Sequence, residues 1–367
     1  MANKKRMPIG IDVVTAARQR IKNVFENTKP VTLSFSGGKD SLCLEHLTYE
    51  LCLSGEIDKS KLTIIFFDEE AIYPCVERIV KVSREKWLSI GVRFNWYSME
   101  YKHFNCLNSL TNDETFICFD RTKKDRWVRD PPSFAIRNHP LLVPGKDSYQ
   151  SWFLKVYRRH FISMVALRAS ESIQRVHAIF TSNIDRTGKV YPIYDWTDKD
   201  VWKYIYDNNI EFPEAYMYMF QCGVKKNFLR ISQFFSVDTI RCLANMCEFY
   251  PNLFDRVCAR EPNAYMAMMY YDTELFRHKK KDSEYIDYRK KTYEMLNNPV
   301  KYNVDMGKVE NKRLRLIIMS YSQMFNDMLW KAAYQVLISG DPKLRTCRGI
   351  MSKLFSNEYQ KGINTND

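Results

Sequence analysis

Apolar positions along the first 215 residues alternate between short continuous runs and a spacing of three to four residues. Continuous apolar runs of this length are typical of strands that are buried on both faces of a sheet, whereas the longer spacing is typical of helices. The pattern predicts strands at residues 31–35, 62–67, 92–99 and 176–181. It predicts helices at residues 11–28, 39–53, 74–90 and 149–170, and from 197 onward. This alternation favours a parallel α/β sheet with helices on both faces.

Two stretches depart from this alternation. Residues 101–150 are rich in proline and lack a regular spacing, which predicts a long irregular insertion of a kind that often carries function. Beyond about residue 215 the strand signal fades, and the spacing becomes helical and rich in methionine and tyrosine. We therefore predict two domains: a nucleotide-binding sheet domain at residues 1–215, which contains the insertion, and a helical, basic domain at residues 216–367.

The composition is that of an ordinary folded protein. The chain has 367 residues, of which 45% are apolar and 27% are charged. No apolar run approaches the length of a membrane span, and the basic N-terminus is not followed by the apolar segment of a secretory signal. The ten cysteines include no CxxC pair, which favours reduced thiols. We therefore expect a cytoplasmic protein with no membrane partner.

Positive charge exceeds negative charge in this sequence. Lysine and arginine number 56 against 43 aspartates and glutamates, which gives a formal net charge of +13. Such a balance favours a polyanionic partner, which could be DNA, RNA or a nucleotide. The basic run Arg277–Lys281 lies beside Tyr270, Tyr271 and Phe276, and aromatic rings among cations suit nucleic-acid bases. A solvated helix face explains the same run equally well.

The segment Ser36–Ser41, Ser-Gly-Gly-Lys-Asp-Ser, is the most informative in the chain. It joins a predicted strand to a predicted helix, so its glycines let the backbone approach a ligand to which the first N–H groups of the helix also point. Phosphate is the natural ligand of such a turn, since the helix dipole favours negative charge there. The hydroxyls of Ser36 and Ser41 add donors, and Asp40 can cap the helix or help to hold a cation.

This segment resembles the PP-loop, SGGxDS, of ATP pyrophosphatases and phosphoadenylyl-sulfate (PAPS) reductases. The resemblance implies an adenine-nucleotide alpha-hydrolase-like, Rossmann-like fold with ATP or PAPS as ligand, whose phosphates lie at this turn. The residues expected to bind them are Ser34, Ser36, Gly37, Gly38, Lys39, Asp40 and Ser41. A Gly-Gly turn that only connects two elements is the plain alternative.

Asp68, Glu69 and Glu70 follow directly on the second predicted strand. Open α/β sheets bind ligands outside the carboxyl ends of their strands, so these carboxylates are expected near the nucleotide. Asp68 is a candidate to bind adenine or ribose, or to hold Mg²⁺ together with Asp40. Glu69 and Glu70 are candidates to bind metal or to orient a nucleophile, and a solvated acidic turn explains them equally well.

A second block, Leu167–Ser172, resembles the G-[IVL]-R-x-x-E-S segment of the same families, with Ala166 at the place of the glycine. The resemblance implies that Arg168 binds phosphate oxygens, for which its planar fork is suited. The sequence places Arg168 at the end of the predicted helix 149–170.

A third block, Tyr191–Trp202, resembles the family pattern P-[IL]-x-D-W-[ST]-x-x-D-[VI]-W. It implies that Asp195 and Trp196 shape the mouth of the nucleotide pocket. The three blocks stand in family order, and together they extend the resemblance over roughly residues 30–215.

The insertion resembles a particular branch of this superfamily, the prophage-associated IbrA-like co-activators. The similar segments are Thr115–Asp120, Trp127–Pro131 and Phe67–Ala71. Proteins of this branch are found beside a ParB-like protein, so the resemblance implies a ParB-like partner. It does not specify a reaction.

The cysteines depart from the pattern of true PAPS reductases. Those enzymes attack the sulfate with a cysteine in a C-terminal E-C-G-x-H tail, whereas the last cysteine here is Cys347 in a different context, so sulfonucleotide reduction is disfavoured. The cysteine pairs of the iron–sulfur members are also missing. Cys242 and Cys247 are five residues apart on a predicted helix and do not share a face, so an iron–sulfur cluster is disfavoured.

These observations favour an enzyme that cleaves the α–β bond of ATP and releases pyrophosphate along Ser36–Ser41, while the adenylyl group activates an acceptor. Lys39, Asp40, Asp68 and Arg168 are the expected catalytic residues, because the chemistry depends on positioning and charge neutralisation. The reaction could serve sulfur transfer or nucleic-acid modification. The alternative is a regulator that retains the pocket as a nucleotide sensor and binds DNA or a ParB-like partner.

Overall fold

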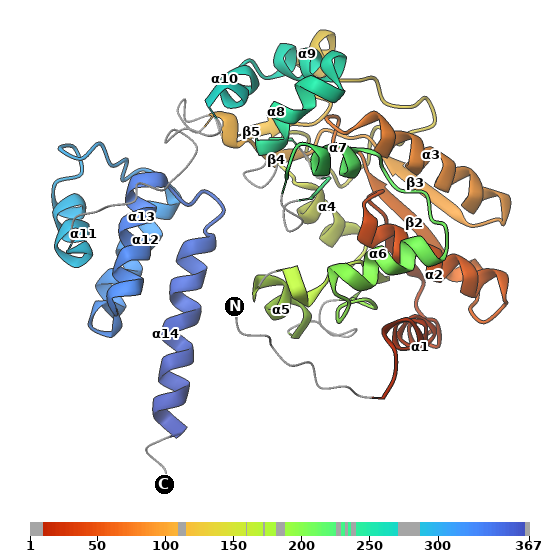
Figure 1. The fold of residues 1–367 in the computed structure, drawn as a ribbon, viewed down its shortest axis with the longest axis horizontal. Coiled ribbons are helices and arrows are strands. Elements are labelled where there is room, and N and C mark those ends of the chain that lie inside the picture. The colour runs from red at the N-terminus through yellow and green to blue at the C-terminus, as the bar shows by residue number, and fades with distance from the viewer. Residues whose placement is uncertain are drawn as a thin grey trace. The chain divides into compact units, whose positions relative to one another are not determined.

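The computed structural model describes residues 10–108, 115–158, 160–171, 173–180, 188–224, 229–231, 234–235, 240–270 and 287–363. A five-stranded parallel sheet has the order β3-β2-β1-β6-β7 (Figure 1). Its strands are β1 (Val31–Ser34), β2 (Leu62–Phe67), β3 (Arg93–Tyr97), β6 (Ile162–Val165) and β7 (Lys189–Val190). The α/β fold class predicted from the sequence is therefore confirmed.

The strand order reverses at β1. The chain moves from β1 to β2 and β3 on one side, and later enters β6 and β7 on the other side. Ser34 is the last residue of β1 and pairs with Ile65 of β2 and Val165 of β6. Open α/β sheets bind ligands outside the carboxyl ends of the strands at such a reversal. The segment that follows Ser34 therefore lies at the position where this topology favours a ligand.

Helices cover the sheet and account for the apolar strands. α4 (Tyr149–Val156) packs Trp152 and Phe153 into an apolar cluster with Ile65 and Tyr97 of the sheet. The crossover helices α2 (Lys39–Leu53) and α3 (Pro74–Ser89) are joined by buried Glu45, which accepts hydrogen bonds from Ser83 at 3.1 Å and Trp87 at 2.8 Å. α1 (Val13–Phe25) and α6 (Asp198–Asp207) pack on α2.

Two predicted elements between residues 149 and 181 are wrong. The expected helix 149–170 is α4 followed by strand β6, and residues 176–180 of the expected strand belong to helix α5 (Ile173–Phe180). A four-residue buried strand carries too little periodicity to be distinguished from a helix segment, which explains the first error. Arg168 therefore follows a central strand of the sheet, at the edge where β1 also ends.

The insertion at residues 101–150 is mostly irregular, as predicted. It contains a two-stranded antiparallel sheet of β4 (Lys102–Phe104) and β5 (Thr115–Ile117). Two short 3₁₀ helices, η2 (Cys106–Asn108) and η3 (Arg121–Arg126), flank β5 in sequence. Outside the insertion, the 3₁₀ helix η1 (Lys59–Lys61) precedes β2 and the 3₁₀ helix η4 (Ala169–Glu171) follows β6.

The chain divides into two compact units, residues 1–271 and 272–367. The first unit includes α7 (Ala215–Gln221), α8 (Ile240–Phe249), α9 (Pro251–Arg260) and α10 (Asn263–Tyr270). The boundary that the sequence placed after residue 215 thus falls inside this unit. Helices α9 and α10 belong with the sheet because they contact η3 and η2 of the insertion.

The second unit is helical. Its elements are α11 (Tyr288–Asn297), α12 (Val309–Tyr321), η6 (Ser322–Met324), α13 (Asp327–Ser339) and α14 (Arg345–Ile363). Its apolar core includes Leu314 of α12, Trp330 of α13 and Ile350 of α14. No helix in the described part of the chain is long and apolar enough to cross a membrane.

A buried ion pair joins the end of β2 to α9 and the insertion. The carboxylate of Glu70, which is fully buried, lies 3.0 Å from Nε of Arg260. It also accepts the backbone N–H groups of Phe119 at 2.6 Å and Val128 at 3.1 Å, while Arg260 donates to the carbonyl of Ile117 at 2.8 Å. Burial raises the pKa of Glu70, and the charge of Arg260 opposes that rise. In the structure Glu70 therefore anchors the insertion and α9 to the sheet.

Replacing Arg260 with glutamine should destabilise the first unit by about 3–5 kcal/mol, because it leaves the Glu70 carboxylate buried without a cation. The free energy of unfolding in urea measures the effect. Arg256→Gln, at an exposed position on the same helix, is the matched control and should stay within about 0.5 kcal/mol of the wild type. Equal stabilities for the two variants would contradict the anchoring role.

Candidate functional site

The segment Ser36–Ser41 forms a tight turn between β1 and α2. Gly37 has a φ of +71°, in the left-handed region that favours glycine. A Cβ at this position would lie 2.9 Å from Cγ2 of Val80 and 3.0 Å from Cγ1 of Val76. Both the backbone conformation and the close approach of α3 therefore require glycine here.

The turn is held by its own hydroxyl groups. Oγ of Ser41 donates to the carbonyl of Gly38 at 2.9 Å, accepts the N–H of Ser36 at 3.2 Å and lies 3.0 Å from Oγ of Ser36. Gly38 is the N-cap of α2, whose first helical hydrogen bond joins the N–H of Leu42 to its carbonyl at 2.9 Å. The N–H groups before this bond have no i−4 acceptor within the helix. The predicted turn is therefore present and is held by its own hydroxyl groups, while phosphate binding at this turn stays a prediction.

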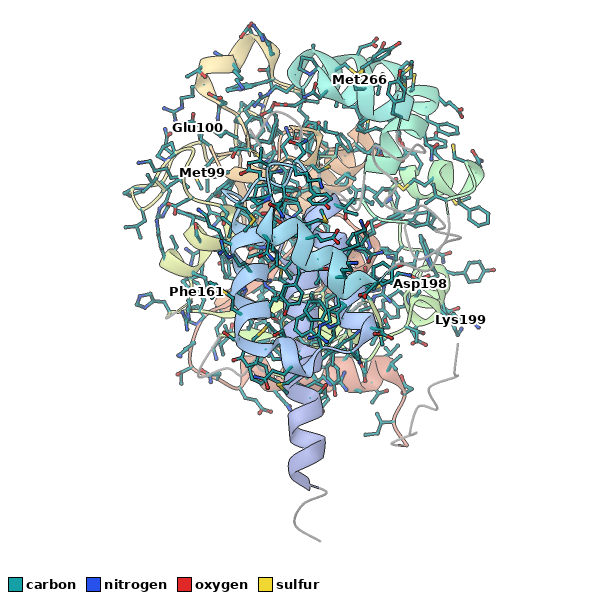
Figure 2. All side chains as sticks on the ribbon, turned by 90° about the vertical axis from the view of Figure 1, so that its left-hand side faces the viewer. Met99, Glu100, Phe161, Asp198, Lys199 and Met266 are labelled. Carbon is teal, nitrogen blue, oxygen red and sulfur yellow. The ribbon has the colours of Figure 1, made fainter. Side chains whose placement is uncertain are left out.

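Two buried cations, Lys39 within the turn and Arg168 next to it, share the carboxylates of Asp40 and Asp198. Nζ of Lys39 lies 3.4 Å from Asp40 and 3.7 Å from Asp198. Asp198 is the first residue of α6 and is labelled in Figure 2. Nε of Arg168 lies 2.6 Å from Asp40, and its Nη2 lies 2.9 Å from Glu171 and 3.5 Å from Asp198. Lys39 is only 5% exposed and Arg168 only 2%. The structure thus brings together Lys39, Asp40 and Arg168, as the sequence predicted.

Asp68 lies at the end of β2 with both carboxylate oxygens occupied. Oδ2 accepts from Trp96 and Ser98, each at 2.8 Å, and Oδ1 accepts the N–H of Glu70 at 3.1 Å and binds the guanidinium of Arg129. Arg129 comes from the insertion. The roles of Asp68 toward a nucleotide or in catalysis stay predictions, and either role would require one of these partners to be released.

The predicted Mg²⁺ ligands do not fit a metal site in this arrangement. Asp40 holds Arg168 and Asp68 holds Arg129, so each carboxylate is already paired with a buried guanidinium. Over the described residues, no group of three or more histidine, cysteine, aspartate or glutamate side chains is placed to hold a metal ion.

Glu69 lies beside His103, whose side chain is 11% exposed. Nε2 of His103 is 3.9 Å from its carboxylate, and the ring centroids of His103 and Tyr149 are 5.4 Å apart. Burial lowers the pKa of His103 to about 4, so this histidine is neutral at physiological pH. The role of Glu69 toward a nucleotide stays a prediction.

Asp195 and Trp196 fasten α1 to the sheet domain. The two Nη atoms of Arg20 on α1 each lie 2.8 Å from an oxygen of Asp195, in a bidentate pair. Trp196 is fully buried, and its indole N–H donates to the carbonyl of Val13 at 3.1 Å. The predicted contact of these two side chains with a nucleotide stays a prediction.

Burial raises the pKa of Cys347 and of Cys258, two of the cysteines considered for catalysis or cluster binding. Cys347 is fully buried in the core of the second unit, and burial raises its pKa to about 12. A thiol nucleophile needs a lowered pKa and access to its substrate, so Cys347 is unsuited to attack sulfate. Burial also raises the pKa of Cys258 to about 11. The side chain of Cys242 lies outside the described residues.

A comparison with models of protein families identifies the family of this chain. The family model "Phosphoadenosine phosphosulfate reductase domain" matches residues 30–222. The chain belongs to this family. The match includes the turn Ser36–Ser41, Arg168 and the segment with Asp195, so the geometry described above is that of a member of the PAPS reductase domain family.

Individual relatives of this family member are distant. It is 27% identical over 320 residues to the uncharacterized protein YbdN of Escherichia coli (strain K12), which covers 80% of this chain and 77% of YbdN. A phosphoadenylyl-sulfate (PAPS) reductase from Candida auris is 11% identical with a TM-score of 0.33, over 60% of this chain and 89% of that chain. The U34-tRNA thiolase NcsA from Methanococcus maripaludis, with its [4Fe-4S] cluster, is 10% identical with a TM-score of 0.33. This match covers 70% of this chain and 78% of the thiolase chain.

Sequence reasoning missed three residues at this edge of the sheet. Asp198 lies within the third block, where it could have been noted, but it resembled an ordinary acid at a helix start. Arg129 lies within the insertion block, and no local pattern indicates its pairing with Asp68. Tyr216 accepts the backbone N–H of Lys39 at 3.1 Å, and nothing in the sequence indicated this contact.

The neutral His103 predicts a loss of stability in acid. Its pKa is about 4 in the fold against 6.5 for the free side chain, so its contribution is complete above about pH 6.5 and falls as the pH drops toward 4. Between pH 7.5 and pH 5 the wild type should lose about 2 kcal/mol of unfolding free energy through this group. His103→Gln should lose that much less over the interval, as measured by urea unfolding at both pH values.

The control for this prediction is His160→Gln, at an exposed position. It should follow the wild type across the pH range. If His103→Gln shows the same pH dependence as the wild type and the control, the assignment of a buried neutral imidazole is wrong.

Proposed function

We propose that this protein is a nucleotide-binding enzyme that holds the phosphates of ATP at Ser36–Ser41 and cleaves the α–β bond. The observation that carries this proposal is the preformed turn itself, which lies where the strand order reverses and presents the N-terminus of α2. Family membership supports a nucleotide ligand. PAPS carries similar phosphates and is the second candidate ligand.

Lys39 and Arg168 would neutralise the charge that grows on the departing pyrophosphate. Both side chains are buried and form ion pairs with the carboxylates of Asp40, Glu171 and Asp198. Phosphate oxygens would replace some of these carboxylate contacts, and Asp40 would keep the guanidinium of Arg168 oriented. Fixed cations in a site with little water stabilise such charge without reorganisation. We assign no Mg²⁺ ligand to the chain.

The adenylyl group would pass to an acceptor. The resemblance to the PP-loop families favours an acceptor that takes part in sulfur transfer or belongs to a nucleic acid. The buried thiol of Cys347 argues against PAPS reduction. If the protein binds ATP but never releases pyrophosphate, alone or with a ParB-like partner, the alternative of a nucleotide-sensing regulator is favoured.

Gly38→Val should abolish nucleotide binding and leave the fold intact. A Cβ at Gly38 would lie 3.3 Å from Oη of Tyr216 and 3.4 Å from Oγ of Ser36, so a larger side chain fills the space in front of α2. The φ of −81° accepts an ordinary residue. We expect at least about a 100-fold loss of ATP affinity by calorimetry, equivalent to about 2.7 kcal/mol.

Gly349→Val in α14 is the matched control, since a Cβ there meets no atom within 4 Å. It should bind ATP as the wild type does, and both variants should keep the far-UV circular dichroism of the wild type. Unchanged affinity in Gly38→Val would show that the phosphates bind elsewhere.

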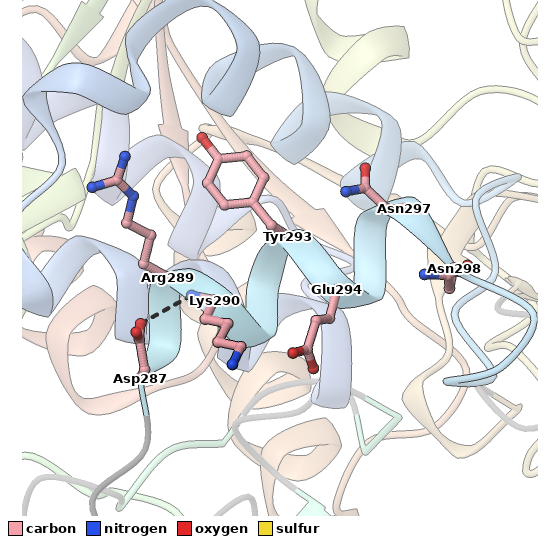
Figure 3. A pocket seen from close by; sticks show the side chains of 7 residues that line it. All are labelled: Asp287, Arg289, Lys290, Tyr293, Glu294, Asn297 and Asn298. Atoms are coloured by element: carbon pink, nitrogen blue, oxygen red, sulfur yellow. Dashed lines mark hydrogen bonds between the residues drawn. The ribbon is translucent and has the colours of Figure 1, made fainter.

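The basic surface supports DNA or RNA as a further partner. α12 exposes Lys312, Arg313 and Arg315, and Figure 3 shows Arg289 and Lys290 of α11 beside the carboxylates of Asp287 and Glu294. The mixed charges of α11 leave α12 as the better candidate for contact with phosphate. The basic runs at residues 277–281 and 225–226 lie outside the described residues.

Binding to double-stranded DNA should weaken steeply with salt if α12 contacts phosphates. Replacing Lys312, Arg313 and Arg315 with glutamine should make the slope of log K against log salt shallower by about 2–3. Fluorescence anisotropy between low and physiological salt measures this slope. Exposed Lys331→Gln on α13 is a single-charge control and should change the slope by no more than about 1. An unchanged slope in the triple variant would show that these three side chains do not contact DNA phosphates.

A ParB-like protein is the proposed protein partner, and it rests on the likeness of the insertion to the IbrA-like branch. Arg129 gives the insertion a structural link to the site, because it joins the segment that carries the likeness to Asp68. Co-purification with the product of a neighbouring ParB-like gene would support this partner.

A further inference from the structure

Tyr216 of α7 reaches the turn between β1 and α2 from a distant part of the sequence. Its hydroxyl oxygen accepts the backbone N–H of Lys39, the first residue of α2, at 3.1 Å. The same oxygen lies 3.3 Å from the position that a Cβ on Gly38 would take, and Oγ of Ser36 lies 3.4 Å from that position. Two hydroxyl groups therefore border the space in front of Gly38.

The proton of the Tyr216 hydroxyl has no acceptor in the described part of the chain. The contact with Lys39 uses the oxygen as an acceptor, and it is the hydrogen bond that the structure gives this group. The side chain is only 4% exposed, so water has little access to the hydroxyl. A buried O–H without an acceptor costs about 1–3 kcal/mol, and an oxygen of a ligand in the turn would remove that cost.

The surroundings fix the ring and keep the hydroxyl protonated. The ring packs edge-on against Trp202 of α6, with centroids 5.5 Å apart, and Nζ of Lys39 lies 5.7 Å from the ring centroid. Burial raises the pKa of Tyr216, and the nearby charge of Asp40 adds to that rise. Tyr216 is therefore a fixed, neutral donor at the N-terminus of α2.

We propose that Tyr216 is a phosphate-binding residue, which donates its hydroxyl proton to a phosphate oxygen of the ligand while it accepts the N–H of Lys39. This inference rests on the proposed binding of phosphates at Ser36–Ser41 and adds a contact from outside the three sequence blocks. The bound group would be the pyrophosphate portion of the nucleotide, since that is the part the turn holds. The hydroxyl of Tyr216 would then link α7 directly to the ligand that is bound at the turn.

The opposite arrangement is that the hydroxyl occupies the place of a phosphate oxygen and must leave before a ligand enters. The two arrangements predict opposite effects when the hydroxyl is removed. A donor that is lost weakens binding, whereas a competitor that is lost strengthens it and frees the N–H of Lys39 for the ligand.

The experiment compares Tyr216→Phe with Tyr218→Phe by calorimetry, with inorganic pyrophosphate and with ATP. Tyr218 lies on the same helix, and its ring stacks on Phe249 with centroids 4.5 Å apart, so it is a matched control for the loss of one hydroxyl. A hydrogen bond to a charged group contributes about 1.5–3 kcal/mol, so Tyr216→Phe should bind both ligands at least about 10-fold more weakly than the wild type. Tyr218→Phe should match the wild type.

Unchanged or tighter binding by Tyr216→Phe overturns the proposal and leaves the proposed function standing. If the wild type itself binds neither ligand, the proposed function fails and the inference fails with it. A second readout uses the wild type alone: in ¹⁵N-labelled protein the amide resonance of Lys39 should shift when pyrophosphate is added. A resonance that stays in place at saturation overturns the proposal, even if Tyr216→Phe does not fold.

Discussion

The central position of β1 in a parallel sheet is the constraint on which the rest of the site depends. Parallel strands end at the same edge, so the segments that follow β1, β2 and β6 must meet there. The first of these segments is the turn Ser36–Ser41, the second carries Asp68, and the third carries Arg168. This geometry brings residues that are more than a hundred positions apart in the sequence to one edge of the sheet.

Buried ion pairs also hold together the segments that meet at this edge of the sheet. Buried cations are costly unless they are paired, and each arginine at this edge has a carboxylate: Arg168 with Asp40, Arg129 with Asp68, and Arg260 with Glu70. The pairs of Arg129 and Arg260 join the insertion and α9 to the sheet. The pair of Arg168 with Asp40 joins the segment after β6 to the first turn of α2. A ligand in the turn must therefore compete with carboxylates that already satisfy the cations.

The sequence predicted the turn well because its chemistry is local. A strand, two glycines and a helix start can be identified over a dozen residues, and the structure shows both the left-handed Gly37 and the N-terminus of α2. The motif Leu167–Ser172 identified Arg168 as a candidate site residue, although the pattern predicted a helix where β6 precedes it. Three of the four partners of Asp68 come from other segments, namely Trp96, Ser98 and Arg129. Asp195 likewise pairs with Arg20 on the first helix. Pairings over such separations leave no local pattern, which is why Tyr216 was missed as well.

A crystal structure of the protein with the non-hydrolysable analogue α,β-methylene-ATP would show directly whether the phosphates bind at Ser36–Ser41. We expect the β- and γ-phosphates to lie against the backbone N–H groups at the start of α2, within hydrogen-bonding distance of Lys39 and Arg168. Phosphates bound at another edge of the sheet, or bound in the second unit, would contradict this expectation.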